Sequence, residues 1–105
     1  MAARIQLPKG IRRGQLIKIG ILIQHPMESG YRLDAENKKV PKNAIRSFIC
    51  RYNGEEIFSA EMSPGIAANP FLKFPTVARD SGELEFSWVD DAGERGSARE
   101  SIKVA

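Results

Sequence analysis

Isoleucine occupies every second position of one short segment, and this spacing limits the folds open to the chain. Between residues 15 and 24, Ile17, Ile19, Ile21 and Ile23 alternate with other side chains. Successive side chains of a β-strand point to opposite sides, so these isoleucines share one face. Such a β-branched, apolar face requires a second layer that buries it. The segment therefore predicts a core strand of a layered β-protein.

Similar short runs, separated by turn residues, follow along the chain. Strands are expected at residues 4–8, 45–52, 55–62, 71–78, 83–90 and 97–104. Asn53-Gly54 indicates a tight hairpin, and Pro75 places its run at a sheet edge or a bulge. Residues 27–43 lack a sustained period and are expected to form a long excursion, with a hairpin turn near residues 36–38. The prediction is one domain over residues 1–105, an all-β, immunoglobulin-like sandwich of about seven antiparallel strands.

Composition and charge disfavour several classes of protein. The 105 residues carry 16 basic and 13 acidic side chains, a net charge of +3, which is too small an excess to indicate a nucleic-acid-binding protein. The longest apolar stretch, residues 19–23, is far shorter than the roughly 20 residues of a membrane helix. No export signal follows the first residues. We therefore expect a soluble protein that binds neither nucleic acid nor membrane.

Candidate catalytic or metal-binding residues are few. His25 and Cys50 are the only histidine and cysteine, whereas a metal site usually takes three or four such ligands. Cys50 shares a strand face with Phe48 and Tyr52, and an apolar setting raises a thiol's pKa, so an inert core thiol is favoured over a Cys–His pair or an intersubunit disulfide. His25 is interpreted either as a structural residue that bonds a loop carbonyl or as an interface residue. No catalytic residue, metal site or cofactor is expected.

Charged residues outside this pair have an ordinary interpretation. The carboxylate pairs Glu55-Glu56 and Asp90-Asp91 lie in or beside hairpin turns, where we expect them to be solvated. Two groups of basic residues are either solvated faces or a positive patch that steers an anionic partner. These groups are Lys9, Arg12, Arg13 and Lys18, and Lys38, Lys39, Lys42 and Arg46.

The segment from residue 64 to residue 70 is an uncharged loop with a proline at each end. It reads Pro-Gly-Ile-Ala-Ala-Asn-Pro, although surface loops usually carry polar residues. Either Ile66 folds back to plug its own sandwich, or the loop docks against a partner protein. The residues predicted to contact a partner are Ile66, Ala67, Asn69 and Pro70, with His25, Pro26 and Met27 as weaker candidates.

Several collinear segments resemble the SoxZ family. They are His25-Pro-Met-Glu28 with Gly30 and Arg32, and residues 52–60, 64–71 and 84–93. The resemblance implies an immunoglobulin-like sandwich that forms a heterodimer with SoxY, the SoxYZ carrier of bacterial thiosulfate oxidation. In the family, SoxY holds the sulfur intermediates on a cysteine near its flexible C-terminus. Cys50 lies within an expected strand instead, which matches the subunit that carries no sulfur.

The resemblance also implies a role and a location. The chain would be a non-enzymatic subunit that binds SoxY, helps the carrier dock transiently to other Sox enzymes, and reaches the periplasm by co-export with a signal-bearing partner. Self-association of the isolated subunit stays open. The alternatives are a generic immunoglobulin-like protein-binding or structural domain, and a small redox or metal enzyme on a similar sandwich.

Overall fold

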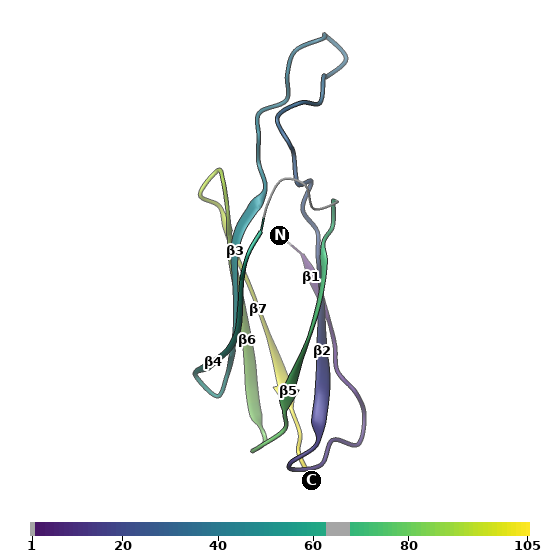
Figure 1. Cartoon of the computed structure of the whole chain (residues 1–105), viewed down its shortest axis with the longest axis vertical. Helices are drawn as coiled ribbons and strands as arrows, with labels where there is room; N and C mark the ends of the chain where they lie inside the picture. Colours follow the sequence, from purple (N-terminus) through teal and green to yellow (C-terminus); the bar gives the residue numbers. More distant parts are fainter. Residues whose placement is uncertain (1, 63–67) are drawn as a thin grey trace.

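Seven strands in two antiparallel sheets make up the computed structural model, which describes residues 2–62 and 68–105 (Figure 1). The three-stranded sheet has the order β1 (Ala3–Gln6), β2 (Leu16–Ile23) and β5 (Phe71–Val77). The four-stranded sheet has the order β4 (Glu55–Glu61), β3 (Ile45–Tyr52), β6 (Gly82–Asp90) and β7 (Arg95–Ile102). The predicted all-β sandwich is confirmed. Among the described residues, no helix is long and apolar enough to cross a membrane.

The core lies between the inner faces of the two sheets. In β2, Ile19, Ile21 and Ile23 have no exposed surface, as the alternation predicted. The opposite sheet buries every second residue of β3 and β6, namely Phe48, Cys50, Tyr52, Leu84, Phe86 and Trp88. Burial of this apolar surface contributes about 25 cal/mol for each Å² removed from water, and it is the main force that holds the two layers together.

Aromatic and polar contacts join the two sheets along one side. The rings of Phe58 in β4 and Phe74 in β5 are stacked, with their centroids 4.3 Å apart. The Tyr52 hydroxyl donates to the carbonyl of Asp80 and accepts the Arg79 N–H at 3.1 Å.

Two local predictions are also confirmed. β5 is an edge strand, as Pro75 predicted. Asn53 and Gly54 both adopt positive φ in the hairpin between β3 and β4.

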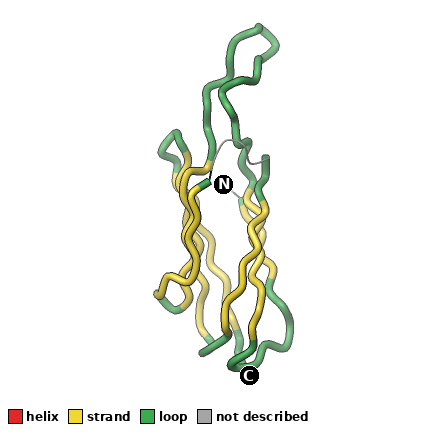
Figure 2. The backbone as a smooth tube through the Cα atoms, viewed as in Figure 1, coloured by secondary structure: helices red, strands yellow, loops and turns green. Residues whose placement is uncertain are grey.

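Residues 28–43 form a hairpin arm that projects beyond one end of the sandwich (Figures 1 and 2). Bridges pair Glu28 with Asn43 and Leu33 with Lys39, and the expected turn is present, with the Asp34 N–H donating to the Lys38 carbonyl at 2.9 Å. The arm makes the molecule 56 Å long and gives it a radius of gyration of 16.0 Å. A compact domain of this size would have about 13 Å. The unpatterned sequence of this segment reflects the absence of a core for it to cover.

Candidate partner-binding end of the sandwich

His25 links three segments at the end of the sandwich from which the arm projects. It lies two residues after the end of β2, and its side chain continues the inward positions of Ile17 to Ile23. Its backbone N–H donates to Oδ1 of Asn69 at 3.1 Å, and its carbonyl accepts the Asn69 N–H at 2.8 Å. The Ile23 N–H also donates to the carbonyl of Pro70 at 3.0 Å. These bonds fix the last residues of the 64–70 loop beside the His25-Pro26-Met27 segment.

The ring of His25 is fully used inside the fold. Nε2 lies 3.1 Å from Oδ2 of Asp90, and Nδ1 accepts the backbone N–H of Met27 at 3.0 Å. Because Nδ1 is an acceptor, Nε2 carries the ring proton and its N–H donates a hydrogen bond to the carboxylate of Asp90. The pair joins the end of β2 to the end of β6, and so connects the two sheets. His25 is thus a structural residue, although its partner is a carboxylate and a backbone amide rather than a loop carbonyl.

Asp90 is buried, which corrects the expectation that the Asp90-Asp91 pair is solvated. Its side chain is 1% exposed, whereas that of Asp91 is 17% exposed. Burial alone would raise the pKa of Asp90, but hydrogen bonds from His25 and from the amides of Glu94 and Ala92 outweigh it and hold the pKa below 3.8. Asp90 also extends the inward series of Leu84, Phe86 and Trp88. The alternation along β6 could therefore have predicted that Asp90 is buried. Its place beside the hairpin turn led instead to the expectation of a solvated residue.

Met27 anchors the base of the arm. It adopts a φ of 51°, which is uncommon for a residue with a side chain, and it is 5% exposed. Its sulfur accepts the N–H of Ile45 at 3.3 Å, at the first residue of β3. The arm therefore leaves the sandwich from a buried residue rather than from a loose connection.

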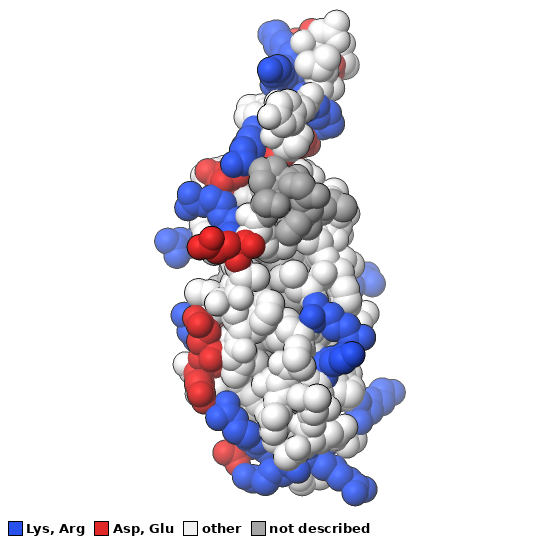
Figure 3. All heavy atoms as spheres, viewed as in Figure 1, with Lys and Arg blue, Asp and Glu red and all other residues white. Residues whose placement is uncertain are grey.

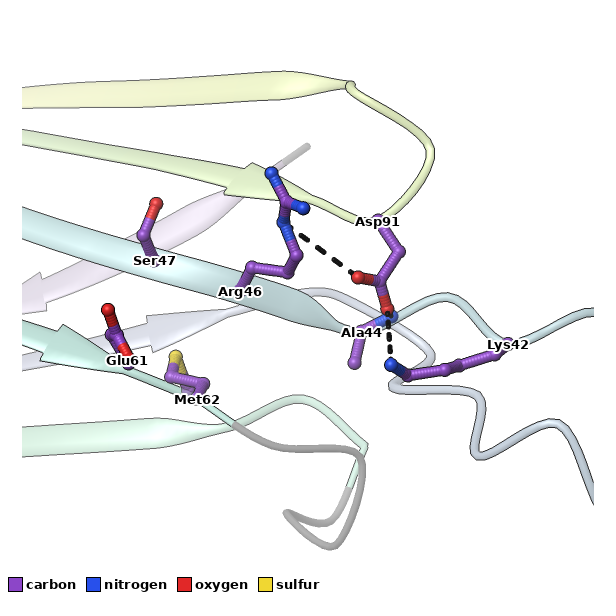
Figure 4. A pocket seen from close by; sticks show the side chains of 7 residues that line it. All are labelled: Lys42, Ala44, Arg46, Ser47, Glu61, Met62 and Asp91. Atoms are coloured by element: carbon purple, nitrogen blue, oxygen red, sulfur yellow. Dashed lines mark hydrogen bonds and ion pairs between the residues drawn. The ribbon is translucent and has the colours of Figure 1, made fainter.

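A polar pocket of about 380 Å³ lies beside this base (Figure 4). Asp91 points into it between two cations, with Lys42 Nζ at 3.8 Å and Arg46 Nε at 3.9 Å from its carboxylate oxygens. Oδ2 of Asp91 also accepts the N–H of Ala44 at 3.1 Å. Lys42 and Arg46 are balanced by the carboxylates of Asp91 and Glu61, so the residues that line the pocket carry no net formal charge.

The predicted contact residues fall into three groups. Ile66 and Ala67 lie outside the described residues. Pro26 and Asn69 are exposed, Pro26 following His25 in the chain and Asn69 bonded to His25, whereas His25, Met27 and Pro70 are buried. The three buried residues lie directly beneath or beside the two exposed ones. Contact with a partner stays a prediction for all seven.

Cys50 and His25, the candidates for a reactive pair, are both buried. Burial raises the pKa of the Cys50 thiol to about 12, and both ring nitrogens of His25 are occupied by other groups. Within residues 2–62 and 68–105, no three His, Cys, Asp or Glu side chains gather as a metal site would require.

Comparisons with known proteins place this fold and sequence. No curated protein was found to be similar to the sequence. A superoxide reductase (neelaredoxin) from Ignicoccus hospitalis has a similar structure, with a TM-score of 0.74, 17% identity, and coverage of 100% of this chain and 81% of the other. A Thermotoga maritima protein assigned as a superoxide reductase gives a TM-score of 0.72 at 12% identity, with 98% and 85% coverage. Such low identities show a shared fold alone.

The sequence itself gives the more specific result. The family described as "Sulphur oxidation protein SoxZ" matches residues 5–101. This match includes both halves of the His25–Asp90 pair and the entire arm. The chain belongs to the SoxZ family of sulfur oxidation proteins.

Proposed function

We propose that this chain is the non-catalytic subunit of a SoxYZ sulfur carrier. It binds a SoxY-like subunit, which carries the sulfur intermediates on its C-terminal cysteine, and it helps the carrier dock to the other enzymes of sulfur oxidation. Co-export with that partner would bring it to the periplasm. The membership of the SoxZ family supports the general role in sulfur oxidation.

One observation carries the proposal for partner binding. Residues 25–28 and 64–71, two of the segments in which the chain resembles the family, are separated by about forty positions, yet the reciprocal hydrogen bonds between His25 and Asn69 bring them together. The buried bond from His25 to Asp90 holds the same point against the opposite sheet. A surface fixed in this way requires little ordering when a partner binds, which favours tight association.

The arm favours a role in docking. Tyr31 is 82% exposed and Leu33 is 53% exposed, although both side chains are large and apolar. Aromatic side chains are enriched among the residues that anchor protein interfaces. Transient contacts with the enzymes that process the carrier's sulfur would use such residues.

Co-expression with the SoxY subunit of the same organism tests the proposal. We expect the two chains to co-purify and to form a heterodimer in light scattering. After incubation with thiosulfate and the other pathway enzymes, intact-mass spectrometry should find added sulfur on SoxY and none on this chain. Separate elution of the two chains, or sulfur bound to Cys50, would contradict the proposal.

A further inference from the structure

The outer faces of the two sheets differ sharply in charge. On the four-stranded sheet, Glu56, Arg51, Glu85 and Arg99 lie opposite one another in register, so charges of alternating sign cross the face. Such a row neutralises itself and is typical of a surface that meets only water. The three-stranded sheet has no comparable row.

β1, β2 and β5 contain three cationic residues and no acidic residue. The cations are Arg4, Lys18 and Lys73, and within residues 2–62 and 68–105 none of them forms an ion pair. On the side of the sandwich seen in Figure 3, acidic and basic side chains are interspersed along β3 and β4, while the edge towards β2 and β5 shows only basic and uncharged residues. The three cations of this sheet are therefore not neutralised by an ion pair within the described residues.

The same face also exposes large apolar side chains. Leu16 and Val77 lie directly opposite each other in register and are 66% and 49% exposed. At the other end of the sheet, Phe71 is 47% exposed and lies opposite Leu22. Two such apolar pairs on one regular sheet face, with Lys18 and Lys73 between them, favour an interaction surface.

Gly20 shapes the centre of this face. A Cβ atom at this position would lie 2.9 Å from the ring of Phe71, so a larger residue here would require the ring to move from its place beside Gly20. Beside it is a depression of about 340 Å³, which Lys18, Gly20 and Lys73 help to line. The depression could receive a side chain from another protein, and the two lysines would favour a carboxylate there.

We infer that this surface is covered by a partner protein that presents an apolar patch bordered by acidic side chains. The basic sheet face, as we name it, consists of Arg4, Leu16, Lys18, Leu22, Phe71, Lys73, Pro75 and Val77. This inference rests on the proposed function, because the partner that we assign to the face is the SoxY-like subunit. A second copy of the chain fits poorly, since two such faces would bring cations against cations.

The basic sheet face is continuous with the end of the sandwich described above. Phe71 follows Pro70 directly, and the Pro70 carbonyl accepts the N–H of Ile23 at the end of β2. One partner could therefore cover both the exposed Asn69 and the sheet face. Asn69 and Pro70 would then mark one end of the interface rather than its centre.

Affinity for purified SoxY, measured by calorimetry, tests the inference with two variants and matched controls. Lys18→Glu combined with Lys73→Glu changes the charge of the face, and Arg95→Glu combined with Lys103→Glu makes the same change of net charge at exposed positions elsewhere. Leu16→Glu is matched by Ser59→Glu on the outer face of β4. We expect the two face variants to weaken binding about tenfold or more, and the controls to bind like the wild type.

Hydrogen exchange on the wild-type complex gives a readout that needs no variant. Binding of SoxY should slow exchange at the edges of β1 and β5 and leave β7 unchanged. If SoxY binds but the face variants retain wild-type affinity and β1 and β5 gain no protection, the inference is wrong while the proposed function stands. If wild-type protein does not bind SoxY, both are wrong. A homodimer that forms through this face, without an effect of the variants on SoxY, would also overturn the inference.

Discussion

The imidazole Nε2 of His25 lies 3.1 Å from the carboxylate of Asp90, and both side chains are only 1% exposed. Each residue occupies the first inward position beyond a run of apolar inward residues, one at the end of β2 and the other at the end of β6. A polar pair thus replaces the apolar core at the end of the sandwich that carries the arm, Asn69 and Pro70. The pair connects the two sheets and sets the position of the surface proposed to bind a partner.

Replacing Asp90 with asparagine should destabilise the protein by about 3 kcal/mol, because it removes the charge that the buried His25 N–H faces. The free energy of unfolding, measured by urea denaturation, gives the size of the effect. Asp91→Asn is the matched control, since Asp91 is half-buried and its ion pairs are 3.8 and 3.9 Å long, so its loss should cost about 1 kcal/mol or less. Equal effects of the two changes would show that the His25–Asp90 pair has no special role.

Stability should fall in acid in a way that depends on Asp90. The folded protein holds the pKa of this carboxyl below its usual value of 3.8, so the folded state favours the ionised form. The contribution is fully present above the pKa of the unfolded state and is lost as the pH falls through the lower, folded value. The difference in unfolding free energy between wild type and Asp90→Asn should therefore be constant near neutral pH and shrink below about pH 4. A difference that stays constant down to about pH 2 would contradict a lowered pKa.

Asn69 combines a hydrogen bond with a backbone conformation that most residues avoid. Its φ is 53°, and its side chain accepts the N–H of His25. Asn69→Ala should lose about 1–2 kcal/mol, because alanine loses the bond and tolerates this φ poorly. Asn69→Gly should lose less, since glycine adopts the conformation without strain. Thermal unfolding of the two variants separates the two contributions, and a glycine variant less stable than the alanine variant would show that the backbone conformation has no cost.

Much of the fold could be predicted from the sequence, because period-two alternation is a local property. The strand that contains Ile17 to Ile23 and the hairpin at Asn53-Gly54 were placed correctly for this reason. The bond between His25 and Asn69 could not be predicted, since 44 positions separate the two residues and no repeating pattern connects them. The unpaired charge of the three-stranded sheet also depends on which strands become neighbours, which alternation alone does not determine.

Cys50 should not react with thiol reagents in the folded protein. It is fully buried in β3, and burial raises the pKa of its thiol to about 12, so the nucleophilic thiolate is scarce near neutral pH. Because it is the only cysteine of the chain, labelling with a disulfide reagent at about pH 8 reports on this residue alone. We expect almost no labelling of the native protein and complete labelling in denaturant.

Cys50→Ala should lower stability by about 1 kcal/mol and leave the affinity for SoxY unchanged, because the small side chain contributes packing and no chemistry. Rapid labelling of the folded chain would instead reveal an accessible thiol and reopen a direct role for this subunit in carrying sulfur.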